Sequence, residues 1–357
     1  MKILLIRLRQ IGDVVFTTPA VHALRRQFPH AHLSYLVEPA AAPVVAHNPH
    51  LSQVIVAPRR SGLIGTLADL SLGRRLRRND FDLVIDFHGG PRASLLAWLS
   101  GAPRRIGYDI PGRGWMYTDV VARPRELRPR HSVENQWDLL APLGIGAPTP
   151  EGFPVEMLTG GDAEERVTRR LKAAGIAGQL IIVMHVSAGN PFRRWPVASF
   201  GEVAARLLAD QSHRRIIVTS GPSEADAAAR VVNDARLRLP ALQQSHVEAW
   251  SDDFPLEDLR ALSARAALYI GGDSGPMHVA ATSDVPMVSL YGPTLPARSA
   301  PWRSHPERAV AVGVQDLACR PCDQRVCVTH DFRCLGRLEP AAVLAAAEFL
   351  LANERVH

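Results

Sequence analysis

The sequence predicts an α/β protein with two doubly wound parallel sheets. Short apolar runs alternate with amphipathic helical patterns along all 357 residues, and a Pro/Gly-rich passage at 144–154 interrupts the alternation once. Alternation at this spacing is typical of right-handed βαβ crossovers, which build parallel sheets. We therefore expect a first domain over residues 1–155, a second over 156–340, a C-terminal helix over 341–357, and a cleft between the two domains.

The first half contains four buried-strand patterns and three helical patterns. The predicted strands are KILLIRL (2–8), HLSYLVE (32–38), QVIVAP (53–58) and FDLVIDFHG (81–89). The predicted helices are PAVHALRRQF (19–28), APVVAHNP (42–49) and GTLADLSLGRRLRR (65–78).

The second half repeats the alternation. Its predicted strands are QLIIVMHVS (179–187), RRIIVTSG (214–221), ALYIGGD (267–273) and VPMVSLYG (285–292). Its predicted helices are 163–175, 197–210, 224–235, 256–266 and 340–354. In doubly wound sheets, ligands bind outside the carboxyl ends of the strands, so the polar residues that follow each apolar run are the candidates for function.

The composition is basic, with 41 Lys and Arg against 35 Asp and Glu, and Lys2 and Lys172 are the only lysines. Arginine clusters at 73–78 and 123–131 suit an anionic membrane surface or a phosphorylated substrate, or are solvated faces. No aromatic residues are interleaved with them, which argues against nucleic acid. No apolar run is long enough to span a bilayer and the first residues lack a signal-peptide pattern, so we expect a cytoplasmic protein.

Asp13 follows Gly12 at the predicted junction between the first strand and the first helix. An aspartate there is either a helix cap or a general base at the cleft between the two domains. Both interpretations are compatible with the sequence.

The stretch YIGGDSGPMHVAA (269–281) is the strongest local signal. A strand ends in Gly-Gly, and a helix opens with Pro near its start, so free backbone amides at that end can bind a diphosphate. Asp273 is expected to accept hydrogen bonds from sugar hydroxyls, with Ser274 and the amides beside it facing the phosphates. The residues assigned to this turn are Asp273, Ser274, Gly275, Pro276, Met277 and His278. The structural alternative is a tight capped turn with a packed histidine.

Two further loops follow strands of the second half. In HVSAGNPFRRWP (185–196), Ser187 and Ala188 allow close approach of a phosphate, and Arg193 and Arg194 neutralise it, unless the segment merely starts a helix with a packed indole. In TSGPSEAD (219–226), Glu224 either binds a ribose hydroxyl or complements a helix dipole.

Four cysteines lie close together near the carboxyl end: Cys319, Cys322, Cys327 and Cys334. Gaps of two, four and six residues match no defined zinc or iron–sulfur pattern. Metal ligands, reduced thiols and local disulfides remain alternatives, and no metal site is assigned.

Several segments together resemble the ADP-heptose–lipopolysaccharide heptosyltransferase family, inverting glycosyltransferases of the GT-B fold with two Rossmann-like domains. The matching segments are 5–29, 131–144, 185–207 and 269–294, with the cysteine-bearing tail after them. They occur in the family's order and extend over nearly the whole chain.

The resemblance implies that Asp13 is the general base and that the 273–278 turn holds the sugar and diphosphate of a nucleotide-sugar donor. Arg193 replaces the lysine that the family usually has, and Glu224 matches a ribose contact more loosely. It implies a lipopolysaccharide-core acceptor, possible peripheral contact with the membrane, and no cofactor or catalytic metal. Gly12, Arg59, Arg60, His88 and Arg92 are the acceptor candidates, with exposed loop charges as the alternative. A different nucleotide-sugar transferase, an epimerase and a non-catalytic anionic-glycolipid binder are the competing functions.

Overall fold

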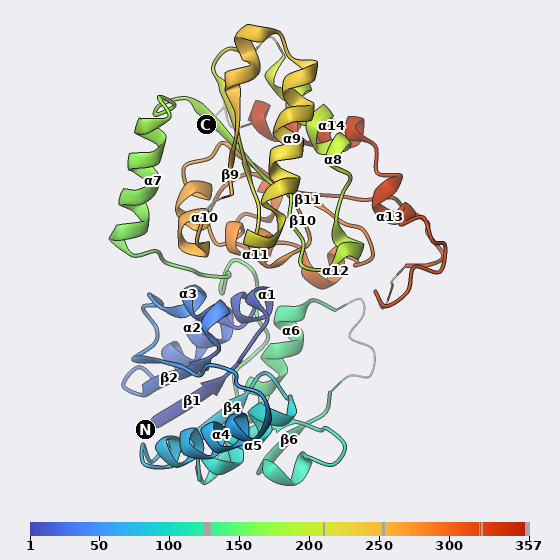
Figure 1. Cartoon of the computed structure of the whole chain (residues 1–357). Coiled ribbons are helices and arrows are strands. Elements are labelled where there is room, and N and C mark those ends of the chain that lie inside the picture. The colour runs from blue at the N-terminus through green and yellow to red at the C-terminus, as the bar shows by residue number, and fades with distance from the viewer. Residues whose placement is uncertain (124–129, 210, 252–253, 321, 323, 354–357) are drawn as a thin grey trace. The chain divides into compact units, whose positions relative to one another are not determined.

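The computed structural model describes all residues except 124–129, 210, 252–253, 321, 323 and 354–357 (Figure 1). Most of the basic cluster at 123–131 therefore lies outside the described residues. The chain forms two compact units. The first comprises Met1–Leu158 and Trp302–Ser304, and the second comprises Thr159–Pro301 and His305–His357.

The first unit contains a six-stranded parallel sheet in the order β3-β2-β1-β4-β5-β6. Its strands are β1 (Lys2–Ile6), β2 (His32–Val37), β3 (Gln53–Val56), β4 (Leu83–Asp86), β5 (Arg104–Tyr108) and β6 (Asp119–Val121). Its helices are α1 (Ile11–Val15), α2 (Thr18–Gln27), α3 (Ala42–Val45), α4 (Gly62–Arg77), α5 (Pro91–Leu99) and α6 (Ser132–Trp137).

The second unit repeats this order, as β12-β11-β10-β7-β8-β9, again with all neighbours parallel. Its strands are β7 (Leu180–His185), β8 (Arg214–Thr219), β9 (Val247–Trp250), β10 (Leu268–Gly272), β11 (Met287–Leu290) and β12 (Ala309–Val312). Its helices are α7 (Gly161–Ala173), α8 (Val197–Leu208), α9 (Ala225–Arg238), α10 (Leu256–Ser263), α11 (Gly275–Ala280), α12 (Pro296–Ser299), α13 (Arg333–Gly336) and α14 (Pro340–Asn353).

Both sheets have the strand order of doubly wound nucleotide-binding folds, in which the winding reverses between the first and fourth strands. These switch points lie between β1 and β4 in the first unit and between β7 and β10 in the second. The prediction of two doubly wound parallel sheets is confirmed. Of the twelve strands, β5, β6, β9 and β12 are not among those that the sequence predicts.

The central strands are buried on both faces because helices cover each sheet, which explains their continuous apolar sequences. β1, β4, β7 and β10 contribute almost only buried side chains. α14 packs against α8 and β11 in the second unit. Trp195 is also part of this core, and its indole Nε1 donates to the Leu338 carbonyl at 3.0 Å. The structural alternative for Trp195, a packed indole at a helix start, is confirmed.

Candidate active site

Asp13 lies in α1, just after β1 ends at the switch point of the first sheet. The residue preceding this helix is Gln10, and Asp13 makes an ion pair with Arg7. Arg7 in turn donates through Nη1 to the Phe87 carbonyl at 2.6 Å, which fixes the guanidinium beside β4. Asp13 is therefore not the N-cap, and its side chain keeps 36% of its surface exposed. Gly12, by contrast, is buried within the helix.

His88 follows β4 at the same switch point. Asp86 holds this turn, accepting the backbone N–H groups of His88 and Gly89 at 2.9 and 3.0 Å. Burial, together with the positive charges of Arg7 and Arg9, lowers the pKa of His88 to about 4, and Asp13 opposes this shift. The imidazole is therefore neutral at pH 7, beside a carboxylate and two arginines. This group of charges at one sheet edge can bind an anionic sugar and accept a proton.

The other acceptor candidates lie along this edge. Arg59 and Arg60 are exposed in the connection from β3 to α4. Arg92, in the first turn of α5, makes ion pairs with Glu38 at 2.8 Å and Asp69 at 2.9 Å, and donates to the Pro58 carbonyl at 3.1 Å. The Arg92 guanidinium is thus occupied by partners within the protein, and it holds the loop that carries the two exposed arginines.

In the second unit, Asp273 organises the turn after β10. Its carboxylate is 3% exposed and accepts hydrogen bonds from Thr294 Oγ1 at 2.5 Å and Ser299 Oγ at 3.1 Å. Arg193 Nη1 and His278 Nε2 each lie 3.3 Å from one of its oxygens. Burial alone would raise the pKa of Asp273, but the hydrogen bond and charge of His278 and the charge of Arg193 outweigh it and lower the pKa to about 2.

Ser274 precedes α11, and Gly275, Pro276 and Met277 form its first turn. The Ser274 hydroxyl is buried and has no hydrogen-bond partner among the residues that the structure describes. A buried unpaired hydroxyl costs free energy, and a ligand that bonds to it recovers that cost. His278, on the next turn, is buried as the structural alternative expects, but it contacts Asp273 rather than only apolar neighbours.

The remaining donor candidates lie at the ends of β7 and β8. Arg194 Nε makes an ion pair with Glu224 at 2.7 Å and donates to the Ala188 carbonyl at 3.0 Å. Ser187 Oγ accepts the N–H of Gly221 at 2.7 Å, which ties the two loops together. All the donor candidates are therefore joined at the carboxyl edge of one sheet.

Four residues that hold the candidate residues of the two units were not predicted from the sequence. Thr294 and Ser299 hold Asp273, and Gln324, from the cysteine-bearing segment, accepts from Arg193 Nε at 2.7 Å. Arg7 is the fourth, hidden in the sequence at the end of an apolar strand pattern. The Ser and Thr after β11 carried a weak signal, since polar residues at strand ends are candidates by position.

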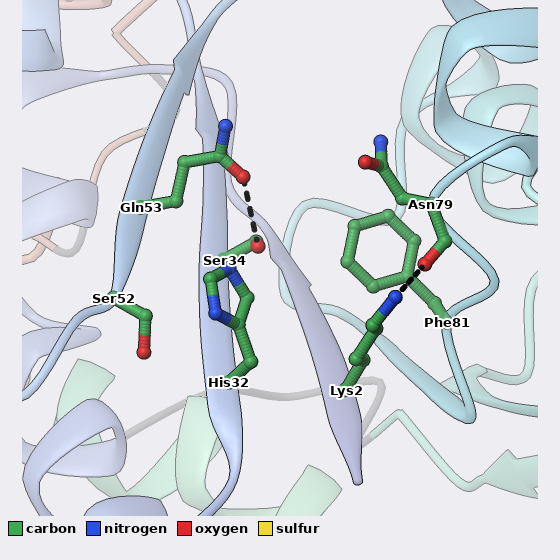
Figure 2. A pocket seen from close by; sticks show the side chains of 7 residues that line it. All are labelled: Lys2, His32, Ser34, Ser52, Gln53, Asn79 and Phe81. Atoms are coloured by element: carbon green, nitrogen blue, oxygen red, sulfur yellow. Dashed lines mark hydrogen bonds between the residues drawn. The ribbon is translucent and has the colours of Figure 1, made fainter.

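The four cysteines are free and line one small cavity together with Phe192 and Phe332. Among the described residues, no three of their sulfurs approach within 4.8 Å of one another. A second hollow lies at the amino edge of the first sheet, where Lys2, His32 and Gln53 line it (Figure 2). It is at the opposite edge from Asp13, away from the ligand-binding side of a parallel sheet.

Comparisons with known proteins agree with this architecture of two doubly wound units, each with a polar cluster at its switch point. Residues 70–332 match the family model described as glycosyltransferase family 9 (heptosyltransferase). The chain belongs to glycosyltransferase family 9. Lipopolysaccharide heptosyltransferase 3 of Escherichia coli is 27% identical over 351 residues, covering 95% of this chain and 96% of that protein.

Solved structures show that members of the family share this fold. The family 9 glycosyltransferase of Veillonella parvula superposes with a TM-score of 0.83 at 23% identity, covering 99% of this chain and 97% of the other. The E. coli ADP-heptose lps heptosyltransferase II gives 0.79 at 21% identity, covering 99% and 100%. The family 9 chain is thus a glycosyltransferase of the GT-B fold. Among its described residues, no helix is long and apolar enough to cross a membrane.

The low pKa of Asp273 leads to a pH-dependent prediction. Because the folded pKa of about 2 lies below the ordinary value of 3.8, the ionised carboxylate stabilises the fold above about pH 4 and loses this effect as the pH falls toward 2. Asp273→Asn is expected to lower the free energy of unfolding by about 3 kcal/mol at pH 7. The deficit should shrink by about 1 kcal/mol between pH 5 and pH 3. Urea unfolding followed by tryptophan fluorescence measures both values, with the exposed Glu165→Gln as control. A loss of unfolding free energy that does not change with pH would contradict the lowered pKa of Asp273.

Proposed function

We propose that the chain transfers a heptose from ADP-heptose to the inner core of lipopolysaccharide, with inversion at the anomeric carbon and with Asp13 as general base. Two kinds of support carry this. The relatives in the family are named lipopolysaccharide heptosyltransferases, and one solved neighbour is named for ADP-heptose. At one switch point the second unit joins a guanidinium, a helix amino terminus and a serine hydroxyl that has no partner among the described residues.

The donor diphosphate is proposed to bind at the first turn of α11. Free N–H groups at a helix start and a nearby guanidinium stabilise phosphate oxygens. Arg193 supplies the guanidinium, and Ser274 donates its hydroxyl. Asp273 contributes indirectly, because its carboxylate holds Arg193 and His278. Glu224, held by Arg194, is proposed to accept from the ribose hydroxyls.

The acceptor is proposed to bind at the carboxyl edge of the first sheet. Arg59 and Arg60 bind its anionic groups, with Arg92 holding their loop and His88 lining the edge beside Asp13. The acceptor is lipid-linked, so the reaction takes place at the cytoplasmic face of the inner membrane, where the basic charge favours peripheral contact with anionic lipid.

The acceptor hydroxyl oxygen attacks the anomeric carbon while Asp13 takes the hydroxyl proton. The bond from the anomeric carbon to the diphosphate oxygen breaks, and ADP leaves with the electron pair. Arg193 and the α11 amides stabilise the negative charge that develops on the leaving group. Attack opposite the leaving group inverts the anomeric configuration. The residues available can stabilise the diphosphate without a catalytic metal.

The test is a panel of nucleotide-sugars incubated with and without a heptose-deficient lipopolysaccharide core. ADP release that requires both ADP-heptose and the acceptor supports the proposal. Release of another nucleotide, or conversion of the sugar without an acceptor, favours a different transferase or an epimerase. Salt-sensitive binding of glycolipid with no turnover of any donor favours a non-catalytic binder.

A further inference from the structure

Three side chains with metal-ligand chemistry converge in the first unit, apart from the transfer site. His22 lies on α2, His50 precedes β3, and Glu156 lies near the end of the unit. One ligand atom from each lies within 4.8 Å of the other two. Glu156 Oε1 is 3.2 Å from His22 Nδ1, and Glu156 Oε2 is 3.2 Å from His50 Nε2. Each side chain is between a fifth and a quarter exposed, so the group is shielded but reachable from solvent.

The two 3.2 Å contacts are ion pairs, and not every atom in them also makes a hydrogen bond. His22 Nδ1 and Glu156 Oε2 are buried atoms without a hydrogen bond among the residues that the structure describes. The two imidazoles are stacked, with ring centroids 4.2 Å apart and planes 10° from parallel. A buried polar atom without a hydrogen bond calls for an explanation, and a bound ion supplies one.

A divalent ion fits this spacing. With bonds of about 2.1 Å to nitrogen and oxygen, neighbouring ligand atoms of a tetrahedral zinc site lie about 3.4 Å apart. The 3.2 Å contacts are close to that value. Two imidazoles and one carboxylate are a ligand set that zinc uses, with water as the fourth ligand, whereas calcium and magnesium prefer oxygen ligands.

The residues around the three ligands favour an ion that binds imidazole nitrogen over one held by the carboxylate charge alone. Phe153 packs edge-on against His22, with centroids 5.4 Å apart, and the Arg26 guanidinium lies over the Phe153 ring at 5.4 Å. One carboxylate beside a nearby cation gives little net attraction for a hard ion such as magnesium. Affinity must therefore come from the imidazole nitrogens.

We propose that His22, His50 and Glu156 form a binding site for a divalent transition-metal ion of the zinc class. To bind it, the stacked imidazoles turn about their Cβ–Cγ bonds until both lone pairs meet the ion beside the carboxylate. Because the ligands must be deprotonated, binding of the ion releases protons and weakens in acid.

The ion would connect three parts of the first unit that are distant in sequence. Glu156 already donates its backbone N–H to Thr18 Oγ1 at 2.8 Å, and its neighbour Val155 donates to the Trp302 carbonyl at 3.0 Å. The first unit's long segment ends two residues later, at Leu158. A bound ion therefore fixes this final stretch to α2 and to the connection before β3, and stabilises the folded unit by binding linkage.

The test uses the full-length, tag-free chain, stripped with EDTA and with its cysteines alkylated, because free thiols also bind zinc and cobalt. Calorimetry with Zn²⁺ should give one site, and Co²⁺ should give the visible absorption of a tetrahedral nitrogen–oxygen site. Glu156→Gln, which preserves shape, and His50→Ala should each weaken Zn²⁺ binding at least about tenfold. His47→Ala, at an exposed histidine of the same connection, should not.

A second readout separates binding from damage to the fold. With the cysteines alkylated, Zn²⁺ should raise the melting temperature of the parent chain and leave that of Glu156→Gln unchanged, while both melt cooperatively without metal. Absence of Zn²⁺ binding to the alkylated chain would overturn the proposal. Equal affinity in the parent chain, Glu156→Gln and His50→Ala would overturn it too, as would cobalt spectra that show only thiolate ligation before alkylation and none after it.

Discussion

Asp13→Asn is expected to slow sugar transfer at least about a hundredfold while leaving ADP-heptose affinity unchanged. A positioned general base contributes about this much to rate, and the amide cannot accept the acceptor's proton. The substitution is nearly isosteric, and the side chain is part exposed at a sheet edge, so the fold should tolerate it.

The measurement is the initial rate of ADP release at saturating donor and acceptor, with donor affinity measured separately by calorimetry. Glu151→Gln, at an exposed carboxylate of the same unit, serves as the matched control and should retain the parent rate. Turnover within about threefold of the parent enzyme would remove Asp13 from the chemistry. A loss of donor affinity as large as the loss of rate would instead assign it to binding.

Arg193→Ala is expected to weaken ADP binding at least about tenfold. Hydrogen bonds to charged groups contribute about 1.5–3 kcal/mol, and about 1.4 kcal/mol corresponds to a factor of ten in affinity. The guanidinium is 30% exposed and is held by the Asp273 carboxylate, the Asp273 carbonyl and Gln324, so it is fixed in place before the ligand arrives.

Because the alanine also leaves the buried Asp273 without one partner, Arg193→Lys is needed beside it. Lysine retains the charge but loses the planar fork, so its ADP affinity should fall between those of the parent and the alanine variant. Arg206→Ala, at a surface arginine of α8 whose partner Glu202 lies at 3.5 Å, controls for lost surface charge. ADP affinity unchanged in Arg193→Ala, in a variant that melts like the parent, contradicts the phosphate assignment.

The sequence was sufficient for the central strands and for the turns that follow them. β1, β4, β7 and β10 are continuous apolar runs, because helices cover both faces of each sheet. The turn after β10 was recognisable because Gly, Asp, Ser and Pro act locally, at a strand end and a helix start. The strands that were not predicted lie at or next to a sheet edge, where runs are short or charged, as in β5 (RRIGY) and the three-residue β6.

The partners of the site residues could not be found in the same way. Thr294 lies 21 residues from Asp273, and Gln324 lies 131 residues from Arg193. Such pairs depend on which loops the sheet order brings to one edge, and no local pattern encodes that. The role of Arg92 could not be predicted for the same reason, because its two carboxylate partners come from other elements of the first unit. Its charge alone suggested an exposed residue that contacts the acceptor.

A crystal structure with ADP-heptose bound is the decisive test of the proposed donor site on the second unit. We expect the diphosphate within hydrogen-bond distance of the Arg193 guanidinium, the Ser274 hydroxyl and the amides that open α11, with the ribose near Glu224. A diphosphate bound elsewhere, with Arg193 still bonded only to Asp273 and Gln324, would rule out this donor site.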